Sequence, residues 1–346
     1  MSAALRAAFE RLLAGGDLTE AEAHAALGGL TDPATSPVLS AGFLTALRMK
    51  GETAEEVRGL AQAMRDAAAG PVESGGRPLV DTCGTGGDGS GSFNLSTACA
   101  LLLAADGLPV AKHGNRSVSS QCGSADLLEA LGVPLCHTPA DASRRLAAHG
   151  FAFLFAPAFH AATAAVMPVR RALGTRTVFN MLGPLANPAR PAHQLVGAWS
   201  AETARLMAQA LAGMGLARAF VVHGEPGWDE ATPVGPFLLL DVANGKVAER
   251  TVDPAEFGIP RCRPADLAGG DPPANAALAR RLFAGEPGPR SDAIVLNAAL
   301  AFLLTGREAA PAAAAARARR VLADGRAAAL LDRLCADGAR EGGGAR

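Results

Sequence analysis

The stretch DTCGTGGDGSGSFNLST, residues 81–97, combines five glycines with several hydroxyl side chains. It lies between a predicted strand and a predicted helix that begins near Asn94. Glycine tolerates positive φ angles and lets backbone N–H groups approach an anion, and a helix start adds further N–H groups. The hydroxyls of Ser92, Ser96 and Thr97 can bond phosphate oxygens or a metal-bound water. The stretch therefore predicts a phosphate-binding loop.

Two other nucleotide-binding patterns have to be weighed for this loop. Gly84, Gly86 and Gly89 satisfy GxGxxG, which in a dinucleotide site expects an acidic residue after the next strand. Here the next predicted strand, LPVAKHG, ends in Lys112 and His113. The P-loop pattern is missing because no Gly-Lys-Ser/Thr sequence follows. A turn without a ligand is the remaining alternative, and five glycines are a costly way to build one.

A second polar loop, KHGNRSVSSQCGSADLLEALG, begins at the end of that strand. Lys112 and Arg116 supply positive charge. Small polar groups come from Asn115, Ser117, Ser119, Ser120 and Ser124. In open parallel sheets, ligands bind outside the carboxyl ends of strands, so both loops are expected to face one cleft. That cleft would suit a phosphorylated, polyhydroxylated ligand, although Arg116 or His113 alone could equally be a capping or surface residue.

An adjacent acidic pair, Asp229 and Glu230, follows the predicted strand RAFVVHG. Mg²⁺ prefers oxygen ligands and binds through one or two carboxylates together with substrate phosphate. The pair fits that chemistry, but most acidic pairs on loops are simply solvated. Its assignment as a metal site therefore depends on the rest of the chain.

The elements that carry these loops fall into two groups. The first seventy residues predict helices only, with Leu5, Phe9, Leu12 and Leu13 on one face of the first helix. Two later helix starts have capping-box spacing, Thr19 with Glu22 and Thr53 with Glu56. After Pro71, short apolar runs alternate with helical segments, which predicts a mostly parallel sheet covered by helices on both faces. Residues 161–182 are expected to be helical, and Asn244-Gly245 predicts a hairpin.

Composition limits the class of protein. The 346 residues are 49% hydrophobic and 19% charged, enough for about two domains with a large core. A net charge of −1 gives no electrostatic footprint for nucleic acid. The six cysteines form no CxxC pair, the N-terminus lacks a signal-peptide core, and no apolar run is long enough for a bilayer. We expect a cytoplasmic protein with reduced cysteines and no membrane or nucleic-acid partner.

Several long motifs together resemble one family. GTGGD, FNLSTA, KHGNRSVSSQCGSADLLEALG, MPVRRALGTRTVFNMLGPLANP and VVHGEPGWDEAT match the anthranilate phosphoribosyltransferases in order, over nearly the whole chain. The resemblance implies an α/β fold: a small helical domain (1–72, joined by helices from about 161–185) and a larger α/β domain with a mostly parallel central sheet flanked by helices (73–160 and 186–340). A flexible tail is expected at 341–346, and the family is homodimeric.

The resemblance also implies roles for individual residues. Residues that bind phosphoribosyl pyrophosphate (PRPP) would be Gly84, Gly87, Asp88, Ser92, Asn94, Ser96, Thr97, Lys112, Asn115 and Ser124. Anthranilate would contact Gly84, Asn115 and Arg170, and the metal ligands would be Ser96, Asp229 and Glu230. This chain departs from the family where Ser92 replaces a common Thr, and where the loop with Trp228 is one residue longer.

The implied reaction transfers the 5-phosphoribosyl group from PRPP to the amine of anthranilate, with two Mg²⁺ ions per site, in tryptophan biosynthesis. An aromatic amine is uncharged at neutral pH, so no strong general base is required, and His113 is expected to shape the site. One alternative is an enzyme similar to pyrimidine-nucleoside phosphorylases. The other is a noncatalytic relative that binds nucleic acid, against which the acidic pair and the pI near 6.7 argue.

Overall fold

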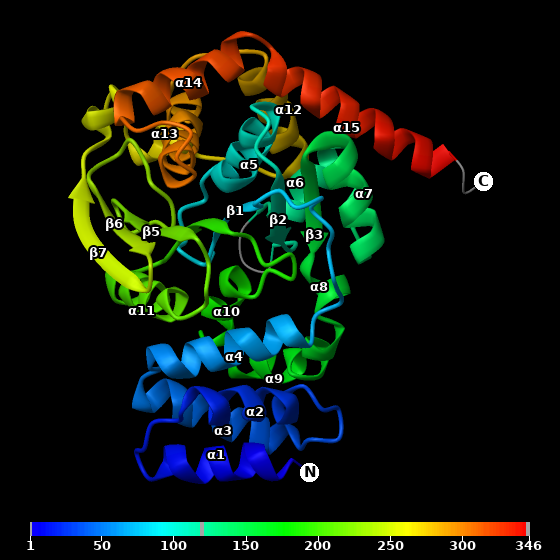
Figure 1. The fold of residues 1–346 in the computed structure, drawn as a ribbon, viewed down its shortest axis with the longest axis vertical. Coiled ribbons are helices and arrows are strands. Elements are labelled where there is room, and N and C mark those ends of the chain that lie inside the picture. Colours follow the sequence, from blue (N-terminus) through cyan, green and yellow to red (C-terminus); the bar gives the residue numbers. More distant parts are fainter. Residues whose placement is uncertain (1, 118–120, 344–346) are drawn as a thin grey trace.

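Helices fill the N-terminal part of the chain, as the pattern predicts. The structure is a computed structural model that describes residues 2–117 and 121–343, so Ser119 and Ser120 lie outside the described residues. The N-terminal helices are α1 (Ala3–Leu13), α2 (Glu20–Leu30), α3 (Pro37–Lys50) and α4 (Ala54–Asp66). Figure 1 shows α1, α2 and α3 as a layer at one end of the molecule, with α4 next to the larger body.

Local sequence signals account for several ends of these helices. Both predicted capping boxes form, at Thr19 and at Thr53, and each satisfies two backbone donors of a helix start. The predicted face of α1 is only partly correct. Leu5 and Leu12 are buried, whereas 60% of Leu13 is exposed. At the last turn of α1, packing against α2 and α3 takes up only part of the apolar stripe.

A seven-stranded sheet organises the larger body, in the order β3-β2-β1-β4-β5-β6-β7. The strands are β1 (Val80–Gly84), β2 (Val110–Gly114), β3 (Phe151–Phe155), β4 (His193–Gly197), β5 (Arg218–Gly224), β6 (Phe237–Ala243) and β7 (Lys246–Val252). The first five are parallel, and the β6–β7 hairpin adds two antiparallel strands at one edge. Positive φ angles at Asn244 and Gly245 confirm the predicted hairpin turn.

Helices cover both faces of the sheet, which confirms the predicted fold class (Figure 1). Side chains alternate along the strands, so Phe220 and Val222 join the core under α5 and α13, whereas Val221 faces α4 and α11. The helices of this body are α5 (Leu95–Ala105), α6 (Ser124–Leu131), α7 (Pro139–His149), α8 (Ala156–Phe159), α9 (Met167–Leu173), α10 (Phe179–Leu185), α11 (Ala201–Ala212), α12 (Pro272–Phe283), α13 (Pro289–Leu304), α14 (Pro311–Ala323) and α15 (Arg326–Gly343). Short 3₁₀ helices cover Ala161–Ala165, Pro254–Phe257 and Pro264–Leu267.

Two segments add detail to the predicted helices. Residues 161–182 are largely helical, as expected, and form separate pieces, because Pro168 lies in the first turn of α9 and Gly174, at φ +61, ends that helix. Helix α15 continues to Gly343, because each residue added to an existing helix gains a backbone bond, and residues 344–346 lie outside the described part.

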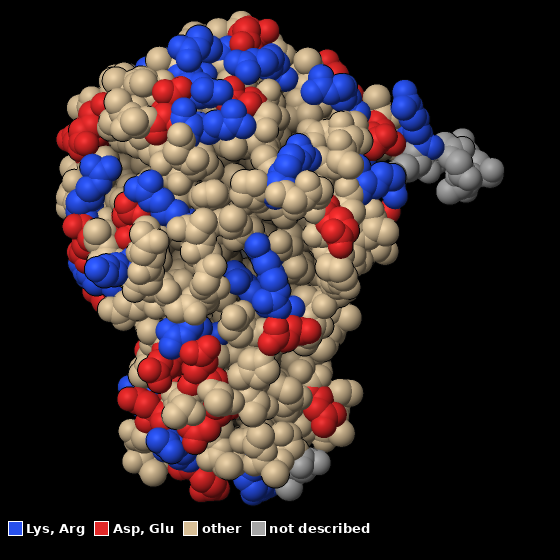
Figure 2. All heavy atoms as spheres, viewed as in Figure 1, with Lys and Arg blue, Asp and Glu red and all other residues tan. Residues whose placement is uncertain are grey.

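The surface carries charges of both signs. Figure 2 shows Lys and Arg side chains interspersed with Asp and Glu side chains over the visible face. Across residues 2–117 and 121–343, no helix combines the length and the apolar character that crossing a membrane requires.

Candidate active site

The site lies where the order of strands in the sheet reverses direction. From β1 the chain winds outward through β2 and β3 on one side and through β4 and β5 on the other, so β1 and β4 mark the topological switch point. In open α/β sheets this is the place where ligands bind. The glycine loop follows β1, the second polar loop follows β2, and the acidic pair follows β5. The fold therefore brings the predicted loops to one edge of the sheet.

The glycine loop has the backbone geometry that the sequence predicts. Gly86, Gly87, Gly89 and Gly91 all have φ between +61° and +73°, a region that glycine enters without strain. Asp88 does not point away from the loop. Its Oδ1 accepts a hydrogen bond from the backbone N–H of Ser90 (3.0 Å), and its Oδ2 accepts one from that of Asp229 (3.3 Å), while the Ser92 Oγ accepts from the hydroxyl of Ser90 (3.1 Å).

Helix α5 begins at the end of this loop, and its N-cap residue does not cap the first turn. Asn94 is the N-cap, but its side chain makes no capping bond. Instead its Nδ2 donates to the carbonyl oxygen of Cys122 (2.9 Å), and its Oδ1 accepts from Asn275 (2.9 Å). Asn94 therefore joins the two polar loops and does not cap the N–H groups of the first turn of α5 with its own side chain.

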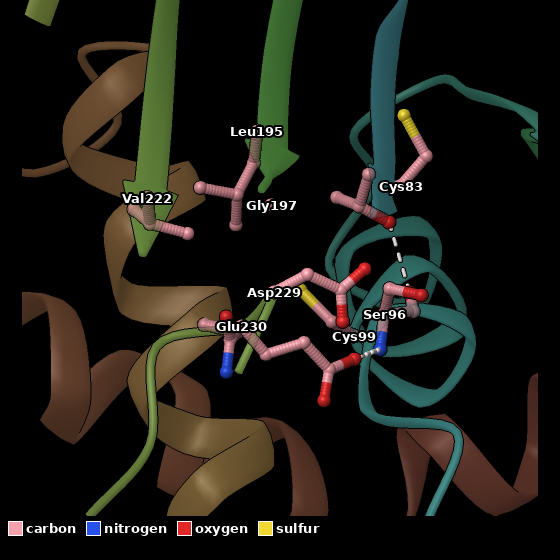
Figure 3. A pocket seen from close by; sticks show the side chains of 10 residues that line it. Cys83, Ser96, Cys99, Leu195, Gly197, Val222, Asp229 and Glu230 are labelled. Carbon is pink, nitrogen blue, oxygen red and sulfur yellow. Dashed lines mark hydrogen bonds between the residues drawn. The ribbon is translucent and has the colours of Figure 1, made fainter. Parts of the chain in front are cut away.

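The acidic pair faces both anion-binding elements. Asp229 Oδ2 accepts a hydrogen bond from the Gly86 N–H (2.6 Å), and Glu230 Oε1 accepts one from the Ser96 N–H at the start of α5 (3.1 Å; Figure 3). Burial, with the nearby charge of Asp88, raises the pKa of Asp229 to about 7. Burial, with the charges of Asp229 and Asp88, raises the pKa of Glu230 well above its ordinary value, although part of its side chain reaches solvent. A cation placed here would relieve this repulsion.

Lys112 and Thr97 lie deeper than the sequence suggests. Only 2% of Lys112 is exposed, and its Nζ donates to the carbonyl oxygen of Thr82 and to Ser96 Oγ (3.3 Å). Its charge therefore lies under the α5 start, beside the acidic pair. Thr97 is fully buried, and its hydroxyl has no partner among residues 2–117 and 121–343.

The second polar loop lies next to the first. Asn115 is exposed; its Oδ1 accepts from the Arg116 N–H (2.7 Å), and its carbonyl oxygen accepts from the hydroxyl of Ser124 (3.1 Å). Ser124 thereby fixes the loop at the first residue of α6 instead of projecting freely. Asn115 is placed to meet a ligand from the solvent side.

Arg170 on α9 is a cation without a carboxylate partner in the described part of the chain. Its guanidinium lies over the Phe179 ring (5.1 Å to the centroid) and contacts Met167 Sδ (3.5 Å). Burial lowers the pKa of Arg170. A partly desolvated, unpaired guanidinium favours an incoming anion.

Two buried histidines, His113 in β2 and His160 after α8, lie next to each other. His113 and His160 pack edge to face with ring centroids 5.0 Å apart. Burial lowers the pKa of His113 to about 3 and that of His160 to about 4. The Nε2 atoms of both rings have no partner within residues 2–117 and 121–343. Both imidazoles are therefore uncharged at neutral pH, which fits the expectation that His113 shapes the site.

Sequence reasoning missed three polar residues that assemble the site. Arg176 donates to the Gly87 carbonyl oxygen and stacks on Trp199, which ties the glycine loop to the segment after β4. Asn187 donates to the buried carboxylate of Asp81 (2.8 Å) and so joins the segment after α10 to β1. Asn297 donates to a carbonyl beside the acidic pair. Only the Asn187 contact had a signal in the sequence: Asp81 is a charged residue inside an apolar strand, and such a residue must find a polar partner.

Both parts of the chain resemble known proteins. Residues 76–328 match the glycosyl transferase family a/b domain, and residues 6–68 match the helical bundle domain of that family. The chain is 50% identical to the anthranilate phosphoribosyltransferase of Solibacter usitatus over 86% of this chain and 88% of that protein. It is 45% identical to that of Moorella thermoacetica over 96% and 98%.

Solved structures extend the likeness to the fold. The crystal structure of the Thermus thermophilus anthranilate phosphoribosyltransferase matches with a TM-score of 0.90 at 46% identity, over 95% of this chain and 98% of that one. The Saccharomyces cerevisiae enzyme in complex with PRPP and Mg matches with a TM-score of 0.88 at 26% identity, over 98% and 99%. By sequence and by fold, the chain belongs to the anthranilate phosphoribosyltransferase family.

Proposed function

We propose that this enzyme carries out its family's reaction at the edge of the sheet described above. It transfers the 5-phosphoribosyl group from PRPP to the amine of anthranilate and releases pyrophosphate, a step of tryptophan biosynthesis. The observation that carries this proposal is the meeting of a glycine loop, the start of helix α5 and two carboxylates at the carboxyl ends of β1, β4 and β5.

PRPP binds across the two polar loops in this proposal. The N–H groups of the glycine loop and of the α5 start hold the diphosphate, and the second loop holds the rest of the molecule. The contacting residues are Gly84, Gly87, Asp88, Ser92, Asn94, Ser96, Thr97, Asn115 and Ser124. Lys112 contributes its charge from below, because its Nζ already bonds Ser96 and Thr82.

The acidic pair suits Mg²⁺. No group of three or more His, Cys, Asp or Glu side chains in residues 2–117 and 121–343 could hold a metal ion alone. Mg²⁺ commonly binds through one or two carboxylates plus substrate phosphate, so Asp229, Glu230 and the hydroxyl of Ser96 fit an ion that arrives with PRPP. The two carboxylates face two different anion-binding elements, which supports two ions per site. When bound, Mg²⁺ offsets the charge on the departing pyrophosphate.

Anthranilate occupies the space between the second loop and α9 in this proposal. Arg170 holds its carboxylate, and Asn115 and Gly84 line the side toward PRPP. The yeast relative has been solved with 4-fluoroanthranilate, an analogue of this substrate. Because the aromatic amine is already nucleophilic, the chain's contribution is to orient it toward the ribose and to exclude water. The neutral rings of His113 and His160 add no competing charge to this region.

A fluorescence assay tests the function directly. Anthranilate fluorescence should decline only when the enzyme, PRPP and Mg²⁺ are all present. A pyrimidine nucleoside with phosphate should give no phosphorolysis, and a DNA or RNA probe should not shift in a gel at physiological salt. Phosphorolysis without loss of anthranilate fluorescence would instead favour the phosphorylase alternative.

The assembly we propose is a C2 homodimer through the N-terminal helices, in the cytoplasm. Val38 and Met49, at the two ends of α3, are 82% and 83% exposed, and Leu13 of α1 is 60% exposed. Large apolar side chains gathered on one small helical layer favour a self-complementary contact. The six cysteines are all free thiols, which suits a reducing compartment.

A further inference from the structure

Three adjacent strands end in glycines that make room for the acidic pair. A Cβ on Gly84 or Gly197 would lie closer than 3.0 Å to atoms of Asp229, and a Cβ on Gly224 would lie closer than 3.0 Å to the carbonyl oxygen of Glu230. None of these three glycines has a positive φ angle. Glycine is therefore required at these positions because a side chain would overlap the acidic loop, and not because the backbone conformation demands it. At Gly197 the obstructing atom belongs to the Asp229 backbone, which cannot rotate aside as a side chain could.

A buried amide fastens the same segment from the opposite side. Asn297, on the apolar helix α13, is 4% exposed, and its Nδ2 donates to the carbonyl oxygen of Ala231 (2.8 Å). It also donates to the Ala293 carbonyl one turn earlier (2.9 Å), which fixes the orientation of the amide. Ala231 directly follows the acidic pair, and Asn297 lines the small cavity seen in Figure 3. A buried amide is costly unless its bonds are made, so this contact orders the peptide after Glu230.

We propose that Gly197 and Asn297 are positioning residues that fix the position and orientation of the Asp229 and Glu230 carboxylates. The proposal rests on the metal role of the acidic pair given above. Asp88, Asp229 and Glu230 repel one another, and an unrestrained loop would relieve this repulsion by moving toward solvent. The three strand-end glycines on one side and the Asn297 amide on the other hold the carboxylates together before a cation binds. The Asn297 amide bonds the carbonyl oxygens of Ala231 and Ala293, neither of which is assigned to a substrate, so it acts through the acidic loop. Gly197 is also the strand partner of Gly84, so its variant is interpreted together with Asn297→Leu.

Asn297→Leu tests the amide, because leucine has a similar size and fits an apolar helix but donates no hydrogen bond. The probe is Mn²⁺ titrated with inorganic pyrophosphate and followed by electron paramagnetic resonance. We expect Mn²⁺ affinity to fall roughly tenfold, the size of one lost buried hydrogen bond. The Mg²⁺ concentration for half-maximal activity should rise by a similar factor, whereas KM for anthranilate should stay within about twofold.

Gly197→Ala provides a second variant, with a larger expected loss of Mn²⁺ affinity because backbone must move. Its matched control is Gly28→Ala on α2, where an added Cβ meets nothing within 4 Å. For Asn297 the control is Leu300→Ala, a fully buried residue one turn further along α13. Leu300→Ala should lower the melting temperature and leave Mn²⁺ affinity unchanged.

The outcomes separate this proposal from the proposed function. If Asn297→Leu and Gly197→Ala retain wild-type Mn²⁺ affinity while Asp229→Asn loses it, the positioning proposal is overturned and the metal site stands. If Asp229→Asn also binds Mn²⁺ with pyrophosphate like the wild type, the metal assignment itself fails. A loss of Mn²⁺ affinity in Leu300→Ala equal to that in Asn297→Leu would reduce Asn297 to a residue of the core.

Discussion

The backbone N–H of Gly86 donates a hydrogen bond to Oδ2 of Asp229 at 2.6 Å, across 143 residues of chain. One partner belongs to the anion-binding loop after β1 and the other to the acidic loop after β5. A carboxylate thus occupies an N–H group of the kind that holds phosphate oxygens. The glycine loop and the acidic pair behave as one unit, and a change in either is expected to affect the other.

Replacing both members of the acidic pair tests this unit. Asp229→Ala with Glu230→Ala should lower kcat/KM at ordinary Mg²⁺ by at least about 100-fold, because the charge on the departing pyrophosphate loses its anchored counter-ion. The protein should stay folded. Burial and mutual repulsion raise the pKa of both groups, so their ionised forms destabilise the folded state and their removal relieves it.

Steady-state kinetics and thermal unfolding measure both effects. Glu55→Ala, on the exposed side of α4, is the matched acidic control and should behave like the wild type. Full activity in the double variant would show that the metal site lies elsewhere.

Arg170→Ala should weaken anthranilate binding selectively. The guanidinium has no carboxylate partner in the described residues, so an anthranilate carboxylate would be its first charged partner. Losing a charged hydrogen bond costs about 1.5–3 kcal/mol, or roughly tenfold to a hundredfold in affinity. Titrating each substrate separately decides the point, since PRPP binding should stay nearly unchanged. Equal weakening of both ligands would assign Arg170 to the fold.

Arg176→Ala should act on the other substrate. Arg176 bonds the Gly87 carbonyl oxygen and lies over the Trp199 ring (4.8 Å), so its removal frees the glycine loop. We expect KM for PRPP to rise roughly tenfold, with KM for anthranilate little changed. Arg176→Lys keeps the charge but loses the planar stacking, and should lie between the two. A rise in KM for anthranilate alone would contradict this assignment.

The histidine pair makes stability depend on pH. Burial lowers the pKa of His113 to about 3 and of His160 to about 4, from 6.5 for an ordinary histidine. Below about pH 6.5 the unfolded chain therefore binds protons on these two rings that the folded chain does not bind. The stability contributed by keeping both rings neutral is complete above about pH 6.5 and is lost as pH falls toward the folded values. Each ring contributes up to about 1.4 kcal/mol per pH unit in that window.

His160→Phe isolates one ring of this pair. Urea unfolding between about pH 6 and pH 4.5 should show the slope of stability against pH reduced by up to about 1.4 kcal/mol per unit, because only His113 remains. An unchanged slope would mean that His160 already takes up its proton in the folded protein.

Charged substitutions on α3 test the dimer. Light scattering of the wild type should give about twice the 34.9 kDa of one chain. Val38→Glu with Met49→Glu should give the monomer, because both exposed apolar side chains would become charged. A wild type that scatters as 34.9 kDa at micromolar concentration would refute the dimer.

Signals that act over a few residues were readable from the sequence alone. The capping boxes at Thr19 and Thr53 and the hairpin turn at Asn244 depend on bonds within three or four residues, so type and spacing sufficed. The same holds for the glycine loop, whose positive φ angles need glycines in a fixed order. The alternation of apolar runs and helices similarly predicted a mostly parallel sheet, with the polar loops at its carboxyl edge.

Long-range pairs were decided only by the tertiary structure. Nothing near Asn297 or Arg176 in the chain indicates that one reaches the acidic loop and the other the glycine loop. The position of the Lys112 side chain was also decided by the tertiary structure. A lysine at this place in the sequence suggested a phosphate ligand, whereas packing buries its charge beneath the start of α5. A side chain's partner across the sheet depends on strand order and on the space left by neighbours such as Gly197, and neither is encoded in the local pattern of residues.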